Sequence, residues 1–357
     1  MVNFSAFSRA REKYTAAAMP FLTELKEKVQ KEQPYRGLTI LHNLPLTIEA
    51  VLKAEVLLVG GAEVTMSCIT TLDPDPEALE ILNAADVNVQ LSHNFTETYD
   101  FHLDCCGELL QFFPPRRGAV ELTQTGSALY KAAQVGYPVI SVDDSEIKLL
   151  ETIFGTGNGF IRALQNSSAE PIYDKKFMVF GYGKVGRGIV HSLTKFADRI
   201  VVVDLNDQSK KAAVERGIKY IDSKKIDEIK KELRDTFCVV TSTGIPNILT
   251  AFYGFRKEDF KGVILTNMGA GDEYGTNFST EDVFFAKKTF NFSIKEPTTM
   301  KYLDPILFAH NLGVDVILSG KVVKGYNPLP KQIDKETIKK WSLWHNEDLS
   351  DIMAYFY

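Results

Sequence analysis

Cysteine and tryptophan are scarce in this chain of 357 residues, which contains four of the first and two of the second. The cysteines are Cys68, Cys105, Cys106 and Cys238, and no pair of them has the spacing of a zinc site. We therefore expect no metal centre, and we interpret the cysteines as buried, reduced thiols.

Long apolar runs and a large net charge are lacking as well. No run reaches the roughly 18 apolar residues of a membrane-spanning helix, and residues 1–12 lack the apolar core of a signal peptide. We expect a cytoplasmic protein. The net charge of −5 gives no reason to expect nucleic acid or an anionic membrane as partner. The length and the hydrophobic content of 45% fit two well-packed domains of ordinary size.

The most informative segment is residues 177–188, where an apolar strand is followed by Gly-x-Gly-x-x-Gly-x-Gly and then by a helical run at 189–196. Gly181 permits the tight turn from strand to helix. Gly183 lets the backbone approach a pyrophosphate, and Gly186 lets the helix pack closely on the sheet. The free N–H groups of that helix then point at the phosphates. The segment predicts a dinucleotide site.

A second apolar strand, residues 200–203, ends on Asp204. The acid follows the glycines by about 20 residues, where a carboxylate accepts hydrogen bonds from the ribose hydroxyls of a dinucleotide. Because a 2′-phosphate would meet a like charge there, the sequence favours NAD over NADP.

Strands and helices alternate along the chain, which predicts an α/β protein with parallel sheets. We predict two Rossmann-like, doubly wound domains with a cleft between them. Residues 1–150 and 301–357 form the expected substrate domain, and residues 151–300 the NAD-binding domain. Strands are expected at 38–41, 63–66, 87–90, 139–142, 237–241 and 263–266, a further strand–helix unit at 289–294, and helices at 3–32, 48–60, 76–84, 145–165, 300–312 and 334–344.

From about residue 38 to 275 the chain resembles the S-adenosylhomocysteine hydrolase family. The resemblance depends on five ordered motifs: Thr47-x-Glu49 before Gly61-Ala62-Glu63-Val64, Thr123-Gln124-Thr125-Gly126, Asp144-Ser145 with Lys148, Glu151 and Phe154-Gly155-Thr156-Gly157, the glycine loop at 181–188, and Thr241-Ser242-Thr243-Gly244. In that family, tightly held NAD⁺ oxidises the ribose 3′-hydroxyl of the substrate, homocysteine is eliminated, water adds, and the ketone is reduced again.

The resemblance implies that most of the residues that bind the cofactor in the family are present in this chain. Its expected cofactor residues are the loop Gly181, Gly183, Lys184, Val185 and Gly186, the acid Asp204, and Thr123, Gln124, Thr125, Thr241, Thr243 and Asn267.

The residues that bind the substrate in the family are matched only in part. Thr47 and Glu49 match the pair that reads the adenine edge in the family, but Pro45 replaces its histidine, for which His42 is the nearest substitute. Asp104 is the expected remaining substrate acid. Further along, Lys148 matches the lysine near the ribose hydroxyls, where it would accept a proton, and Glu151 matches the acid that follows. The alternative for Lys148 is a surface lysine.

The residues that would support elimination are largely replaced. The family's Gly-His-Phe-Asp is Gly269-Ala270-Gly271-Asp272, Leu122 replaces one glutamate, Cys105 replaces an aspartate, and of a late motif only Asn311-Leu312-Gly313 remains. His310, directly before that remnant, is the first candidate for a replacement acid or base, ahead of His93 and His102. The family's C-terminal arm, which reaches into a neighbouring subunit, is missing.

Three functions follow from this pattern. The first is an adenosylhomocysteinase-like enzyme that keeps NAD bound and oxidises a ribose-type hydroxyl of a nucleoside thioether or related molecule. The second is an NAD-dependent dehydrogenase on another small hydroxyl compound. The third is a non-catalytic NAD-binding regulatory protein. We expect a homo-oligomer, with a dimer as the simplest form.

Overall fold

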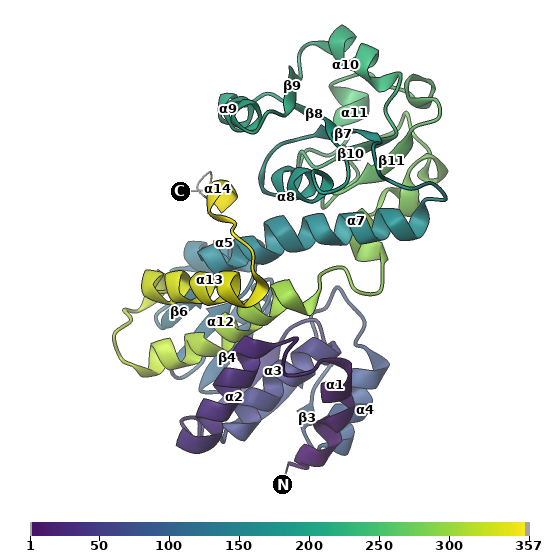
Figure 1. The fold of residues 1–357 in the computed structure, drawn as a ribbon. Coiled ribbons are helices and arrows are strands. Elements are labelled where there is room, and N and C mark those ends of the chain that lie inside the picture. The colour runs from purple at the N-terminus through teal and green to yellow at the C-terminus, as the bar shows by residue number, and fades with distance from the viewer. Residues whose placement is uncertain (1, 354–357) are drawn as a thin grey trace. The chain divides into compact units, whose positions relative to one another are not determined.

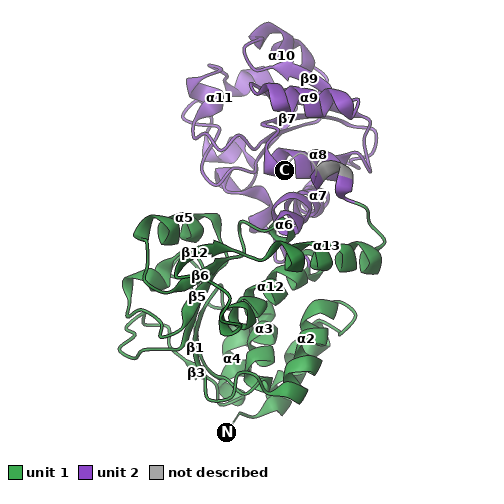
Figure 2. Ribbon diagram, turned by 90° about the vertical axis from the view of Figure 1, so that its left-hand side faces the viewer, with its two compact units in different colours: residues 1–148, 300–348 green, residues 149–299, 349–357 purple. Residues whose placement is uncertain are grey.

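A computed structural model describes residues 2–353. The described chain divides into two compact units, shown in green and purple in Figure 2. Unit 1 contains residues 2–148 and 300–348, and unit 2 contains residues 149–299 and 349–353. Each unit is built on one parallel sheet.

Unit 1 contains a seven-stranded sheet in the order β12-β6-β5-β4-β1-β2-β3. The chain runs from β1 to β3 in one direction and from β4 to β12 in the other, so the switch point lies between β1 and β4. The strands are β1 (Thr39–Asn43), β2 (Glu63–Ser67), β3 (Asn88–Val89), β4 (Phe101–Asp104), β5 (Gly118–Glu121), β6 (Pro138–Ser141) and β12 (Gly325–Pro328). The helices are η1 (Phe4–Phe7), α1 (Ser8–Lys13), α2 (Pro20–Glu32), α3 (Ile48–Val59), α4 (Pro76–Ala84), η2 (Glu108–Gln111), α5 (Gln124–Ala133), α12 (Met300–Leu318) and α13 (Lys331–His345), with α6 (Glu146–Leu149) at the boundary (Figure 1).

Successive residues of the unit 1 strands contribute to different cores, as expected for a sheet covered on both faces. Ile40 and Val120 join the large core beneath α2, α3 and α12. Their neighbours Leu41 and Ala119 belong to separate clusters on the other face, where Ala119 packs with Tyr130 of α5. The strands are therefore buried on both sides, and polar groups gather at their ends.

Unit 2 contains a five-stranded parallel sheet in the order β11-β10-β7-β8-β9. Its switch point lies between β7 and β10. The strands are β7 (Lys176–Phe180), β8 (Arg199–Asp204), β9 (Lys219–Asp222), β10 (Cys238–Thr241) and β11 (Ile264–Asn267). The helices are η3 (Leu150–Gly155), α7 (Thr156–Ser167), α8 (Lys184–Leu193), α9 (Asp207–Glu215), α10 (Ile226–Leu233), α11 (Ile248–Ala251), η4 (Lys257–Phe260), η5 (Thr280–Asp282), η6 (Phe284–Lys287), η7 (Phe290–Ser293) and α14 (Ser350–Met353).

The helical run at 145–165 contains one irregular stretch. Residues Leu150–Gly155 form a π-helix between α6 and α7. Two glycines let this run lie against α8, because a Cβ on Gly188 would come within 1.7 Å of the Ile153 carbonyl oxygen, and one on Gly157 within 2.0 Å of the Gly188 oxygen. The helices on this face of unit 2 therefore approach at backbone contact.

Some expected elements are wrong. Residues 3–32 form three helices and not one, with a break between Lys13 and Pro20. The segment 289–294 is a 3₁₀ turn and not a strand, because Phe290 packs against Phe160 of α7, with ring centroids 5.8 Å apart. None of the helices in the described part of the chain is long and apolar enough to cross a membrane.

Candidate functional site

A cavity of about 470 Å³ opens at the carboxyl edge of the unit 2 sheet. Its wall is formed by the segments that follow β7, β8 and β10, so it lies at the switch point where open α/β sheets bind their ligands. The lining residues are Gly181, Gly183, Val203, Asp204, Leu205, Asn206, Ser209, Ser223, Ser242, Thr243, Ile245, Pro246, Ile248, Ala251, Phe252 and Tyr253.

The glycine loop has the geometry that the sequence predicts. Gly181 has φ of +92°, which is the left-handed region that favours glycine, and a Cβ there would come within 2.5 Å of the Ser242 carbonyl oxygen. A Cβ on Gly186 would come within 2.0 Å of the Gly181 oxygen. By contrast, a Cβ on Gly183 would have no neighbour within 4 Å, since it would point into open space. That space is available to a phosphate group.

Helix α8 begins directly at this loop. Gly183 is its N-cap residue and supplies no side-chain cap, so Lys184 and Val185 occupy an uncapped first turn. The early N–H groups of a helix have no partner within it, and the positive end of the helix dipole adds to their affinity for an anion. The cavity therefore has a phosphate-binding end.

Asp204 is the last residue of β8 and lies beside the start of the glycine loop. Its Oδ2 accepts from the backbone N–H of Tyr182 at 2.6 Å, and its Oδ1 accepts from the N–H of Asn206 at 2.8 Å. The carboxylate is thus held in place beside the glycine loop. A carboxylate has about four lone-pair positions, so two remain for the hydroxyls of a ribose.

The rest of the cavity wall is apolar and partly exposed. Leu205, Ile245 and Phe252 each expose about half of their surface, at 52%, 52% and 51%. Exposed apolar side chains around one concave site indicate a ligand with an apolar face. A flat adenine ring fits such a wall. The cavity therefore suits a dinucleotide, because it combines an uncapped helix end for the phosphates, the carboxylate of Asp204 for a ribose and an apolar wall for a base.

A buried acid that the sequence analysis missed organises the loop after β10. Glu273 is 1% exposed, and its carboxylate accepts from the N–H and hydroxyl of Thr243 at 2.9 and 2.8 Å and from the N–H of Gly244 at 2.7 Å. Burial raises the pKa of Glu273, while these donors oppose that shift. Its one signal in the sequence is its place directly after Asp272, in the segment that replaces the Gly-His-Phe-Asp motif of the S-adenosylhomocysteine hydrolase family.

Thr241 and Asn267 lie beneath the cavity and not in its wall. Both are fully buried, and the Thr241 hydroxyl donates to Asn267 Oδ1 at 3.1 Å. The Asn267 amide donates in turn to the carbonyl oxygens of Gly271 and Lys287, at 2.8 and 2.7 Å. These two residues support the loops, and their direct contact with a cofactor stays a prediction.

The three remaining expected cofactor residues belong to unit 1. Thr123 is the N-cap of α5, and Gln124 and Thr125 form its exposed first turn. The Thr123 hydroxyl donates to Glu121 at 2.7 Å and accepts from the N–H of Cys106 at 2.9 Å. It thus connects α5 to the loop after β4.

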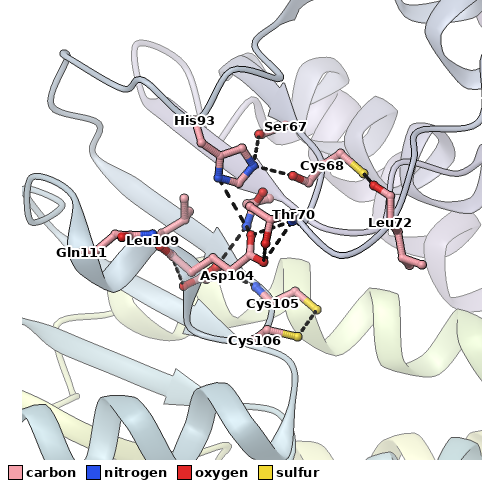
Figure 3. A network of polar contacts seen from close by, with 12 residues as sticks. Ser67, Cys68, Thr70, Leu72, His93, Asp104, Cys105, Cys106, Leu109 and Gln111 are labelled. Carbon is pink, nitrogen blue, oxygen red and sulfur yellow. Dashed lines mark hydrogen bonds and ion pairs between the residues drawn. The ribbon is translucent and has the colours of Figure 1, made fainter.

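That loop is organised around two buried acids, Asp104 and Glu121 (Figure 3 shows the first). Asp104 accepts from the Cys105 and Leu109 N–H groups at 2.8 and 2.9 Å and from the Tyr130 hydroxyl at 2.9 Å. Burial and the nearby charge of Glu121 raise the pKa of Asp104 well above its usual range. The expected substrate acid is therefore fully buried and occupied with its own loop.

The expected adenine-reading pair also has partners within unit 1. Thr47 is the N-cap of α3, with its hydroxyl 3.5 Å from the Ala50 nitrogen. The Glu49 carboxylate accepts a hydrogen bond from the Tyr14 hydroxyl. A purine would have to share or displace these contacts.

Two of the candidate histidines are in the core of unit 1. His42 and His310 are both 0% exposed. His42 Nε2 lies 3.0 Å from the buried Lys53 ammonium nitrogen, and His310 Nε2 donates to the Val120 carbonyl at 2.9 Å. Burial lowers the pKa of all three groups, and the Lys148 charge further lowers that of His310. Neither histidine is exposed to a solute.

Lys148 is 7% exposed and ends unit 1, in α6. Its charge lowers the pKa of His310, after the larger effects of burial and of the Lys53 charge. Glu151 is half-buried in the π-helix of unit 2. The catalytic roles of Lys148 and Glu151 stay predictions.

His93 lies near Ser67, as Figure 3 shows, and near Glu108, in an arrangement that resembles a hydrolytic triad. Its Nε2 is 3.4 Å from Ser67 Oγ, and its Nδ1 is 3.9 Å from Glu108 Oε2. However, Nε2 is only 2.6 Å from the Cys68 carbonyl oxygen. Because a carbonyl can only accept, Nε2 carries the proton and is no base toward Ser67.

The remaining candidate histidine is buried in the unit 1 sheet. His102 lies in β4 and is 1% exposed. Within residues 2–353, no three His, Cys, Asp or Glu side chains are arranged to hold a metal ion.

Comparison with known proteins agrees with the geometry of unit 2. Residues 152–281 match the NAD-binding domain of S-adenosyl-L-homocysteine hydrolase. The chain is 27% identical over 280 residues to an S-inosyl-L-homocysteine hydrolase of Methanopyrus kandleri, and 28% identical over 277 residues to an adenosylhomocysteinase of Sulfurisphaera tokodaii. These matches cover 71% and 70% of this chain but 64% of each relative, so the chain spans a little under two thirds of their length.

A solved structure resembles the fold. The A chain of dipicolinate synthase from Bacillus subtilis aligns with 81% of this chain and all of its own length, with a TM-score of 0.53 and 12% sequence identity. At that identity the likeness concerns the α/β fold alone. The match at 152–281, the relatives and the cavity built for a dinucleotide together make NAD the cofactor of unit 2, and they show that the chain is similar to S-adenosyl-L-homocysteine hydrolases.

Proposed function

We propose that this protein uses bound NAD to oxidise a secondary, ribose-type hydroxyl of a nucleoside thioether or a related small molecule. The observation that carries the proposal is the cavity in unit 2, where an uncapped helix end, Asp204 and an apolar wall surround one dinucleotide-sized space. Two relatives are named for hydrolysis of S-inosyl- and S-adenosyl-homocysteine, which are both purine nucleoside thioethers. We therefore take this class as the first to test.

The residues of the chain have distinct parts in this proposal. Bound NAD supplies a hydride acceptor at the cavity. The first turn of α8 binds the pyrophosphate, and Asp204 orients the adenosine ribose by accepting from its hydroxyls. We propose that Lys148 is the base that accepts the proton of the substrate hydroxyl when the carbon that bears it is oxidised. Glu273 fixes the position of Thr243 in the cavity wall.

Cleavage of the thioether has weaker support. A positioned acid or base contributes about 10²- to 10⁴-fold to a rate, and the sequence has Leu122, Cys105 and Ala270 where the family has acids and a histidine. The histidines nearest to replacing them, His42 and His310, are fully buried. We therefore expect hydroxyl oxidation to be retained and elimination of homocysteine to be slow.

A second candidate function is an NAD-dependent dehydrogenase that acts on another small hydroxyl compound and releases NADH in each cycle. The hydrogen bond between Glu49 and Tyr14 favours it, because the residue expected to read a purine already has a partner. The two functions differ in the fate of the cofactor, which is retained in the first and consumed in the second.

The test begins with the purified full-length protein. Its bound nucleotide is released by denaturation and identified, and the intact protein is then incubated with S-adenosyl- or S-inosyl-homocysteine while NADH absorbance and free thiol are followed. An NADH signal that does not exceed one equivalent of the bound cofactor supports the first function. Net NADH with other hydroxyl compounds only supports the second, and neither signal with any compound contradicts both.

Two variants separate catalysis from cofactor binding. Lys148→Ala should lower turnover by about 10²- to 10⁴-fold and leave the amount of bound NAD unchanged. Lys131→Ala, at an exposed lysine of α5 in the same unit, is the matched control and should have unchanged turnover. Equal turnover of both variants would contradict the role of Lys148.

A further inference from the structure

The proposed function has no use for the two adjacent cysteines at the end of β4. Cys105 and Cys106 follow Asp104 at the carboxyl edge of the unit 1 sheet. Because the switch point of that sheet lies between β1 and β4, they are at the position where open α/β sheets present their reactive groups.

The two sulfur atoms face each other. Cys105 Sγ and Cys106 Sγ lie 3.8 Å apart, and Figure 3 shows both side chains on the same side of the loop. Cys106 has φ of +65° and Gly107 has φ of +69°, so the chain turns sharply there. A left-handed conformation is uncommon for a non-glycine residue.

Three hydrogen bonds from backbone N–H groups fix the conformation of this turn. The backbone N–H of Cys105 donates to Asp104 at 2.8 Å, that of Cys106 to the Thr123 hydroxyl at 2.9 Å, and that of Gly107 to Glu121 at 3.1 Å. The dithiol is therefore carried by a fixed backbone and is not a chance approach of two mobile side chains.

The two thiols differ in exposure and in acidity. Cys106 is half-buried, whereas Cys105 is 4% exposed. The contact between the two thiols lowers the pKa of Cys106 to about 7 and raises that of Cys105. Burial raises the pKa of Cys68 and of Cys238, the latter to about 12. Cys106 is therefore the more exposed and the more acidic thiol of the pair, and Cys105 lies beside it.

We propose that Cys105 and Cys106 form a reversible dithiol–disulfide site that is oxidised by hydroperoxides. This inference does not depend on the proposed function, since it needs neither NAD nor substrate.

The reaction balances in two steps. The Cys106 thiolate attacks the terminal oxygen of the hydroperoxide, the O–O bond breaks, and a sulfenic acid forms on Cys106 while the peroxide is reduced and leaves as hydroxide or alkoxide. The Cys105 sulfur then attacks the Cys106 sulfur, the S–S bond forms and the S–O bond breaks, and water leaves with the Cys105 proton. Two thiols lose two electrons, and one peroxide gains them.

Ring closure would strain the loop. Adjacent Cα atoms across a trans peptide lie about 3.8 Å apart, which is below the roughly 4.4 Å minimum of ordinary disulfides. A strained disulfide is easily reduced, as a reversible site requires. Because the Cys106 N–H is bonded to Thr123, closure would also disturb the cap of α5.

The test uses the full-length protein in its reduced form. After brief treatment with hydrogen peroxide at neutral pH, the peptide that contains both residues should be lighter by two hydrogen atoms, and dithiothreitol should restore its mass. A peptide that gains oxygen atoms instead, or that stays unchanged while Cys68 or Cys238 oxidises, overturns the proposal.

Variants locate the attacking sulfur. Cys106→Ser should abolish rapid oxidation, whereas Cys105→Ser should oxidise at Cys106 and gain oxygen, because no neighbouring thiol can resolve the sulfenic acid. Cys68→Ser is the matched control and should behave as the unmodified chain. Alkylation of the unmodified chain by iodoacetamide should also show a reactive thiol with a midpoint near pH 7 at Cys106; a first reaction at Cys68 or Cys238 would contradict the assignment.

Discussion

Gly183→Ala separates cofactor binding from folding in unit 2. The Cβ that this variant adds would have no neighbour within 4 Å in the free protein. The φ of Gly183 is −77°, so alanine there does not have to enter the left-handed region that favours glycine. The new methyl group would instead stand where the pyrophosphate must approach the backbone.

The expected energies follow from these contacts. Reduced freedom of the unfolded chain stabilises a glycine-to-alanine variant by about 0.4–1 kcal/mol. Alanine is a poorer helix N-cap than glycine by a similar amount, about 0.5–1 kcal/mol. Folding should thus change little. Forcing an extra methyl group into a packed contact costs about 1–3 kcal/mol, which corresponds to a rise in the Kd for NAD of roughly 5- to 140-fold.

The assay combines calorimetric titration with NAD and urea unfolding in its absence. Gly186→Ala is the comparison, because its Cβ would lie 2.0 Å from the Gly181 oxygen and should destabilise folding itself. If Gly183→Ala binds NAD as tightly as the unmodified chain, or unfolds as easily as Gly186→Ala, the location of the pyrophosphate is wrong.

Three further predictions concern the same two units. Asp204→Asn should raise the Kd for NAD by roughly 10- to 100-fold and that for NADP by less, as measured by titration with each; an unchanged ratio would contradict the ribose role. Gly188→Ala should lower the free energy of unfolding in urea by about 1–3 kcal/mol or more, because its Cβ would meet the Ile153 oxygen, whereas Gly136→Ala, with no neighbour within 4 Å, should not. Burial lowers the pKa of His102 to about 4, so between this value and the unfolded value of about 6.5 only the unfolded chain binds the proton and stability falls with falling pH. In the unmodified chain, this effect should lower the free energy of unfolding by about 3 kcal/mol between pH 7 and pH 4. His102→Leu should remove that loss when unfolding is measured over the same pH range, and an unchanged pH dependence would contradict this.

The NAD-binding half could be predicted because its signals are local. The turn at Gly181, the helix that follows and the acid at Asp204 lie within one strand–helix–strand unit, so spacing alone defines them. The family match at 152–281 and the cavity confirm the cofactor.

The carboxyl edge of unit 1 could not be predicted in the same way. Strands β4 and β5 were missed because each has four residues and ends on an acid, Asp104 or Glu121, which strands disfavour. Those acids are satisfied by donors such as Tyr130, 26 residues away in the chain, and Glu49 by Tyr14 at a separation of 35. Such pairs form only when the fold brings distant segments together, so no local sequence pattern predicts them.

The order of elements in unit 1 has a consequence for synthesis of the chain. Helix α12 closes the core over β5, where a Cβ on Gly313 would come within 2.5 Å of Val120, and β12 covers the edge of β6. Both come after residue 299, so a ribosome completes nearly all of unit 2 before the last parts of unit 1 emerge. Domains generally fold as units during translation. We therefore expect unit 2 to be folded while the nascent unit 1 still displays an apolar face and an unpaired strand edge, which makes this interval the stage at which the chain most needs a chaperone.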